Sequence, residues 1–164
     1  MYPLIRNLIK EDQPIIETGF KKWAENIIAN GVPHNNWNLF QADFIVKIAL
    51  ILQDNQAYAD GKGKQYYLDY VVNQNSIRQW SLNKLIDFGF DQKAKIWYES
   101  PGYSTTVLST LCDFANMLDE KAGIDMFKQR PILIDGVKTS AEYLFPNRMI
   151  AGFGDTHPNY LNQG

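Results

Sequence analysis

The stretch YSTTVLSTLCDFANML, residues 103–118, decides the fold class. Its apolar residues recur at spacings of three and four, which is the period of an α-helix with one buried face. The residues on this face are Tyr103, Val107, Leu108, Leu111, Phe114, Ala115 and Leu118. We therefore predict a helix here, packed by this face against the core.

Two more helices are expected before this stretch, over residues 12–30 and from about 37 to 53. A proline near the start and Gly31 after the end suit the termini of the first helix. Its expected inward stripe is Ile15, Ile16, Phe20, Trp23, Ile27 and Ile28. The second is apolar around much of its circumference, including Phe40 and Phe44, so we expect it to be buried on several sides.

The helical pattern continues along the chain. A third helix is expected around residues 66–71, and a fourth begins with Ser76 as its N-cap. The inward residues expected in the fourth are Ile77, Trp80 and Leu85. Residues 87–102 suit a loop, and residues 132–145 remain open between a helix and the start of a hairpin. Helices of roughly 12 to 20 residues with short links predict an all-α fold of antiparallel helix pairs.

Length and composition reduce the number of function classes that fit the chain. The 164 residues suit one domain over residues 1–164, and 45% of them are hydrophobic, as in ordinary globular proteins. The 16 basic and 18 acidic residues leave a formal net charge of −2, which argues against a nucleic-acid partner. The longest apolar run, residues 48–52, is too short to insert into a membrane.

Three common kinds of catalytic site are disfavoured. Residues 60–64 lack the glycine spacing and the Ser or Thr of a phosphate-binding loop. Neither of the two histidines, His34 and His157, sits in an i,i+4 pair with another ligand. Asp155 is two residues from His157, which suits a loop chelate, but a turn-forming Asp is the more common explanation, so no metal site is expected. Cys112 follows a core-facing leucine, and we expect it to behave as a small hydrophobic residue.

Three polar segments suggest function: HNNWN at 34–38, WYESPGY at 97–103 and GFGDTHP at 152–158. Each has an ordinary explanation. Asparagine caps helices, Tyr103 can pack at a helix start, and a glycine-flanked polar loop can be a surface turn.

Together these segments resemble the helical domain of uronate-polysaccharide lyases of the heparinase II/III-like and alginate-lyase kind. That family pairs an Asn motif at a helix start with a later Glu-x-x-Gly-Tyr, here Asn35-Asn36-Trp37 and Glu99 to Tyr103. It also has a helix, a proline link and a Gly-Asp loop, matched by residues 141–146 and 154–155. Many members have His where this chain has Trp37, which leaves open whether His34 substitutes. Asn-Trp also resembles the chondroitin-lyase relatives.

The resemblance implies part of an incomplete α/α toroid of helix hairpins, usually followed by β-sandwich domains that supply a further catalytic His. The chain is then expected to be an internal fragment that binds carbohydrate but turns over little substrate alone. The family also implies a periplasmic or secreted bacterial protein, which the chain itself does not indicate.

The implied reaction is β-elimination on an acidic polysaccharide, with no metal or organic cofactor. Tyr103 is the expected general base, general acid or both, because a phenol can accept and donate a proton. Asn36 is expected to stabilise the charge that develops on the uronate carboxylate, assisted by His34. The residues expected to bind substrate are Asn35, Trp37, Asn38, Trp97, Glu99, Arg148, Asp155 and His157.

One alternative comes from another class of protein. A helical-hairpin scaffold or protein-interaction module would use the aromatic residues, 13% of the chain, for core and interface. It leaves the asparagine cluster and the Glu-Ser-Pro-Gly-Tyr motif unexplained.

Overall fold

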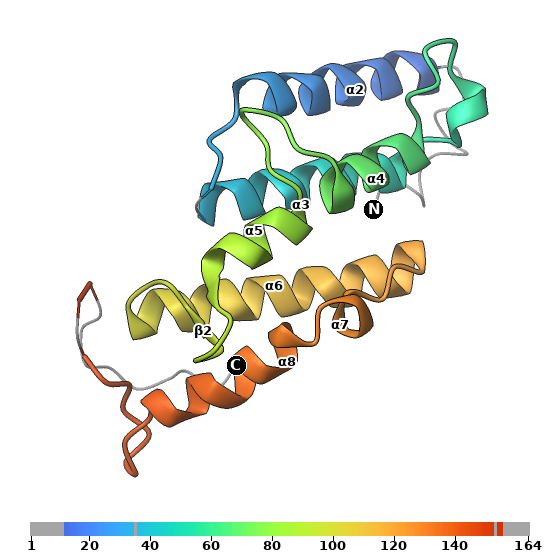
Figure 1. The fold of residues 1–164 in the computed structure, drawn as a ribbon. Coiled ribbons are helices and arrows are strands. Elements are labelled where there is room, and N and C mark those ends of the chain that lie inside the picture. Colours follow the sequence, from blue (N-terminus) through green and yellow to red (C-terminus); the bar gives the residue numbers. More distant parts are fainter. Residues whose placement is uncertain (1–11, 35, 153, 156–164) are drawn as a thin grey trace. The chain divides into compact units, whose positions relative to one another are not determined.

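The computed structural model describes residues 12–34, 36–152 and 154–155, and the chain divides into two compact units, residues 1–85 and 86–164 (Figure 1). The described part is mostly helical, with a single two-stranded sheet, so the predicted all-α class is confirmed. The incomplete toroid and the single domain over residues 1–164 stay predictions.

Three helices lie entirely within the described part of the first unit. They are α2 (Gln13–Asn30), α3 (Asn36–Ile51) and α4 (Lys64–Asn73), and a short 3₁₀ turn, η1 (Asn55–Ala57), precedes the last of them. α3 packs against both of the others. Successive helices run antiparallel in Figure 1, as the short links predict.

α3 contributes more buried residues than either α2 or α4. Its buried residues are Asn38, Leu39, Ala42, Ile45, Val46, Ile48 and Ala49. The expectation that Phe40 and Phe44 are also buried is wrong, because α2 and α4 cover only part of the circumference and leave both rings exposed.

The apolar stripe expected in α2 also needs correction. Ile15 and Trp23 are exposed, whereas Glu17 and Ala24 are buried. Trp23 instead stacks on Phe44 of α3, with 5.9 Å between the ring centroids. A stripe of large residues therefore does not by itself identify the face of α2 that packs.

The fourth helix begins later than the sequence predicts. α5 spans Leu82–Gly89, and the Ser81 hydroxyl accepts a hydrogen bond from the Lys84 amide at 3.1 Å, as an N-cap does. Ser76 accepts instead from backbone amides in a loop, and Ile77 is exposed rather than inward.

The second unit opens with a hairpin where the sequence suggested a loop. β1 (Phe90–Asp91) pairs antiparallel with β2 (Ile96–Trp97). The Asp91 carboxylate accepts from the backbone amides of Lys93 at 2.8 Å and Ala94 at 2.7 Å, which closes the turn between the strands.

The long helix predicted from residues 103–118 is α6 (Pro101–Ala122), ended by Gly123 in the left-handed conformation. α7 (Met126–Gln129) is short, and α8 (Ile132–Ser140) packs against α6. The hairpin interpretation of residues 132–136 is therefore wrong, and a 3₁₀ turn, η2 (Ala141–Tyr143), follows α8.

Candidate functional site

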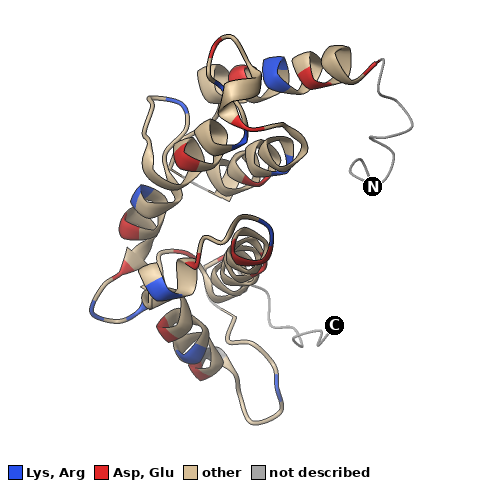
Figure 2. Cartoon of the chain, turned by 90° about the vertical axis from the view of Figure 1, so that its right-hand side faces the viewer, with Lys and Arg blue, Asp and Glu red and all other residues tan. Residues whose placement is uncertain are grey.

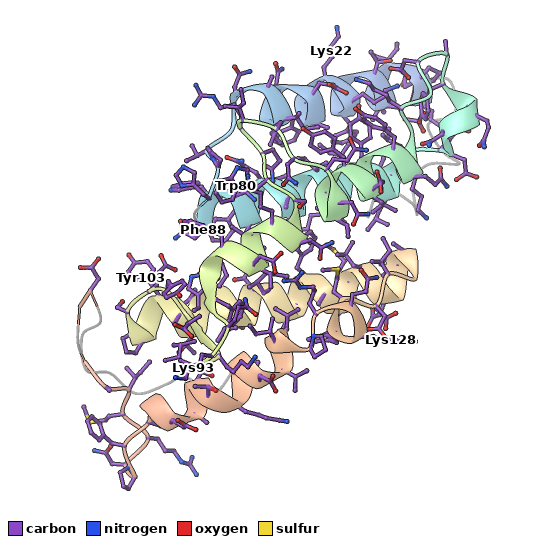
Figure 3. The ribbon with its side chains drawn as sticks, in the orientation of Figure 1. Lys22, Trp80, Phe88, Lys93, Tyr103 and Lys128 are labelled. Carbon is purple, nitrogen blue, oxygen red and sulfur yellow. The ribbon has the colours of Figure 1, made fainter. Side chains whose placement is uncertain are left out.

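An open hollow of about 400 Å³ lies at the start of α6. It is lined by Glu99, Ser100, Tyr103, Gly154 and Asp155. Tyr103 occupies the first turn of the helix and is 48% exposed, so its phenol is accessible to a ligand (Figure 3). The structure thus brings together three of the predicted site residues from two separate sequence motifs. We call this hollow the tyrosine hollow.

The hairpin holds the segment that leads into the tyrosine hollow. The buried Trp97 packs edge-on against Phe90, with 5.3 Å between the ring centroids. A Cβ atom on Gly89 would lie 2.2 Å from the Trp97 ring, so this contact requires glycine. The Trp97 indole N–H donates to Glu99 Oε2 at 2.8 Å. Trp97 is a core residue that orients Glu99, and its buried ring offers no face to a sugar.

The other wall of the tyrosine hollow comes from the C-terminal segment. Gly154 has a φ of 61° and lies so close to Ser100 that an added Cβ would be 3.1 Å from the serine Cβ. Glycine is suited to this position because side chains disfavour both the dihedral angle and the close approach. The geometry therefore places Asp155 opposite the start of α6.

The tyrosine hollow is acidic. Its lining includes the carboxylates of Glu99 and Asp155 and no basic side chain among the described residues. Carboxylates accept hydrogen bonds from sugar hydroxyl groups, whereas they repel the carboxylate of a uronic acid. Arg148, expected near this site, instead lies in the turn from Phe145 to Met149 and does not line the hollow.

The asparagine cluster lies at the start of α3 in the first unit. Asn36 is the first residue of the helix and is half-buried, and Trp37 is 62% exposed, edge-on to Phe40. Both side chains are therefore accessible. Asn35 and His157 lie outside the described residues.

The Asn38 side chain is buried and bonds to backbone, so its role is structural. Its side chain is fully buried, with Oδ1 accepting from the Trp80 amide at 2.9 Å and Nδ2 donating to the Trp80 carbonyl at 3.0 Å. Both ends of the amide are thus occupied by backbone. We therefore leave Asn38 out of the proposed substrate-binding set.

His34 lines a second hollow, of about 750 Å³, together with residues of the segment 75–84. We call it the basic hollow, because its lining includes Arg78 and Lys84 and no acidic residue among those described. Sequence reasoning missed Arg78, Trp80 and Lys84 as binding candidates. No local motif marks them, since they are brought beside His34 by long-range hydrogen bonds.

A third hollow, of about 850 Å³, lies between α2 and α4. Four of its charged residues form ion pairs, Lys21 with Asp60 at 2.7 Å and Lys62 with Glu25 at 2.9 Å, and Lys22 also lines it. The Tyr67 hydroxyl also donates to Glu25, and burial raises the pKa of Tyr67 well above its ordinary value. This groove is a network of internal ion pairs and hydrogen bonds.

Several features bear on other kinds of site. Among the described residues no group of three His, Cys, Asp or Glu side chains is arranged to hold a metal ion. No described helix combines the length and the apolar character that crossing a bilayer requires. Burial raises the pKa of the Cys112 thiol, which disfavours the reactive thiolate. Figure 2 shows basic and acidic residues interspersed along the described helices.

Comparison with known proteins adds one match. Residues 93–164 match the family model of the endo-acting ulvan lyase 2nd domain, which represents a polysaccharide lyase family. The matched residues are less than half of the chain and include Tyr103 and its hollow. No curated protein and no solved structure matches the chain significantly. The second unit is accordingly related to a polysaccharide lyase domain.

Proposed function

We propose that the chain is part of a polysaccharide lyase that cleaves a uronate-containing polysaccharide by β-elimination. The observation that carries the proposal is the exposed phenol of Tyr103, which lies in a hollow inside the residues matched to an ulvan lyase domain. The heparinase II/III-like and alginate-lyase kinship, the α/α toroid and the periplasmic or secreted location belong to the same proposal.

Tyr103 is the proposed proton-transfer residue. A base removes the proton on C5 of the uronate, the electron pair forms the C4=C5 double bond, and the C4–O bond breaks. The leaving oxygen then takes a proton. A phenol group supports this sequence because its oxygen can accept one proton and donate another. The scheme requires no metal or organic cofactor.

The two carboxylates beside Tyr103 limit what the tyrosine hollow can do. Glu99 and Asp155 can hold neutral sugar hydroxyl groups, but they cannot neutralise the uronate carboxylate whose negative charge grows during proton removal. That task needs a neutral or cationic donor. We assign it to Asn36 with His34, and we assign stacking against a sugar ring to the exposed Trp37.

The first substrate to test is ulvan, because the matched family is named for its action on this polysaccharide. Whether the chain acts within a polysaccharide, as the family name states, is part of the proposal. The expectation that turnover needs residues beyond these 164 also stays a proposal, so turnover is measured on the full-length protein and binding on the 164-residue chain.

A helical interaction module remains the second candidate. The observation in its favour is a patch of exposed aromatic rings on α2 and α3, formed by Trp23, Trp37, Phe40 and Phe44. Such a patch is typical of protein interfaces as well as of sugar-binding surfaces.

The test is product chemistry. The full-length protein is incubated with ulvan, alginate, a chondroitin-type polysaccharide and a neutral glucan. The expected result is an ultraviolet-absorbing unsaturated uronate from at least one acidic polysaccharide and none from the glucan. New reducing ends without the unsaturated product would indicate hydrolysis and overturn the proposal. So would the absence of both cleavage and binding across the acidic panel.

A further inference from the structure

The basic hollow of the first unit lies outside the residues matched to the lyase family. Its volume, about 750 Å³, is within the usual range for small-molecule sites. Arg78 and Lys84 are both exposed, and neither makes an ion pair among the described residues. Two cations therefore face solvent in one hollow, and the part of the chain that the structure describes supplies no acidic partner for either.

This arrangement differs from the groove between α2 and α4. There Lys21 and Lys62 each contact a carboxylate at hydrogen-bond distance, which cancels their charge. In the basic hollow no described carboxylate pairs with Arg78 or Lys84, so their positive charges can attract a ligand. An anionic ligand can therefore bind there without displacing an internal ion pair.

The Trp80 ring lies under one of these charges. The Lys84 ammonium lies 3.9 Å from the centroid of its ring, and the His34 ring lies 5.1 Å from it at a tilt of 54°. The Trp80 side chain is half-buried, so part of it remains accessible. The ring thus holds the Lys84 ammonium within the hollow, where its positive charge suits the negative group of a ligand such as an acidic sugar.

The loop that presents Arg78 and Trp80 is held by buried amides. Asn38 bonds both the N–H and the C=O of Trp80, and Gln79 Nε2 donates to the Asn38 carbonyl at 3.2 Å. Gln41 Nε2 in turn donates to Gln79 Oε1 at 2.7 Å. Because the loop is fixed by buried hydrogen bonds, ligand binding does not have to order it.

We propose that the basic hollow binds the anionic group of an acidic polysaccharide, a sulfate ester or a carboxylate, through Arg78 and Lys84. The Trp80 ring holds the Lys84 ammonium in place for this group. The choice of a polysaccharide rests on the proposed function. A nucleic acid is disfavoured because its affinity comes largely from contacts to many backbone phosphates, whereas this hollow offers two cations among the described residues.

The experiment measures binding to the 164-residue chain by calorimetry at low salt. The probes are a sulfated uronate oligosaccharide, a sulfate-free uronate oligosaccharide and a neutral oligosaccharide of equal length. The double variant Arg78→Gln with Lys84→Gln should lose about tenfold or more in affinity for the better acidic probe. The neutral probe should bind much more weakly, and the acidic probe that binds more tightly identifies the group.

The matched control is Lys22→Gln with Lys128→Gln, which removes the same charge from two exposed lysines outside the basic hollow (Figure 3). The affinity of this control variant for the better acidic probe should change by less than about twofold. Equal losses in the two double variants would overturn the proposal, because the attraction would then be non-specific. Tighter binding of a single-stranded RNA than of any oligosaccharide would overturn it as well.

A second measurement, by nuclear magnetic resonance, locates the binding site without relying on the Arg78 and Lys84 double variant. In a nitrogen–proton correlation spectrum, the sugar should shift the indole signal of Trp80 and the backbone signals of residues 76–81. Trp80→Phe should remove that indole signal and weaken binding. Shifts confined to other tryptophans would contradict the proposal. The proposed lyase function fails separately, through the absence of unsaturated product, so the two failures are distinguishable.

Discussion

Asn38 joins α3 to the loop before α5 by bonding both polar backbone groups of Trp80, with distances of 2.9 Å and 3.0 Å. The two residues are 42 positions apart in the sequence. One buried side chain therefore substitutes for the backbone pairing that a strand would provide. The polar cluster HNNWN thus contains a structural residue among its candidate ligands.

Asn38→Ala should destabilise the chain by about 2 kcal/mol, because it leaves the N–H of Trp80 without its partner and removes one of the two donors to the Trp80 C=O, the other being Gln79 Nε2. Urea unfolding followed by circular dichroism measures the change. Asn116→Ala, at an exposed position of α6, is the control and should change stability by less than about 0.5 kcal/mol. Equal effects of the two substitutions would refute the structural role of Asn38.

The buried carboxylate of Glu17 gives a second prediction. The Tyr58 hydroxyl donates to Glu17 Oε2 at 2.7 Å and accepts from the Gln53 amide at 3.0 Å. Since Glu17 is only 2% exposed, water does not readily replace the lost donor. Tyr58→Phe should lower the free energy of unfolding by about 2 kcal/mol. Tyr98→Phe, at an exposed position, should lower it by less than about 0.5 kcal/mol, and a reversed order would contradict the prediction.

The turn between β1 and β2 predicts a pH dependence. Hydrogen bonds from the backbone amides of Ala94 and Lys93 lower the pKa of Asp91. A lowered pKa means that the ionised carboxylate stabilises the fold above its unfolded pKa of about 3.9, and that this stabilisation is lost as the pH falls through the folded value. Asp91→Asn should therefore reduce the loss of stability between about pH 5 and pH 2. Urea midpoints across this range measure it, and identical slopes for the two proteins would contradict the assignment.

The sequence predicts the helices whose period is regular and whose ends are marked. α2 and α6 begin near a proline and end before a glycine, so their bounds are close to those expected. The prediction fails around Ser76, where a serine before apolar residues looks like an N-cap. Its hydroxyl accepts from Gln79 within a loop instead, and Ser81 caps the helix. Local sequence cannot distinguish these two uses of serine, because both bond an amide three residues ahead.

The two candidate hollows also differ in whether local sequence or long-range contacts determine them. Tyr103 and Glu99 are close in the sequence, so their common hollow follows from a helix start that local residues determine. The neighbourhood of Arg78 and Trp80 depends on Asn38 and Gln79, whose contact spans 41 residues. No periodic pattern reports such a contact. The basic hollow was therefore not predictable from the sequence.

The last prediction concerns Tyr103 and uses Tyr98 as its control. Both phenols are exposed in the second unit, but the Tyr98 hydroxyl donates to Asp91 at 3.2 Å and lies outside the lining of the tyrosine hollow. If Tyr103 transfers the proton, Tyr103→Phe should reduce turnover by the full-length protein by about 10²- to 10⁴-fold. Tyr98→Phe should retain nearly all of it.

Measurements of stability and of binding show whether a loss of turnover in Tyr103→Phe comes from catalysis or from a folding defect. Because the Tyr103 ring is half exposed, its hydroxyl contributes little to packing, and Tyr103→Phe should change the free energy of unfolding by less than about 1 kcal/mol. Affinity for an acidic oligosaccharide should also stay within about threefold, since the ring remains and only the proton-transfer group is lost. Release of unsaturated uronate gives the rate, and thermal unfolding gives the stability. Near-normal turnover in well-folded Tyr103→Phe would end the assignment of Tyr103 as the proton-transfer residue, because no other change in that variant could compensate for the missing hydroxyl.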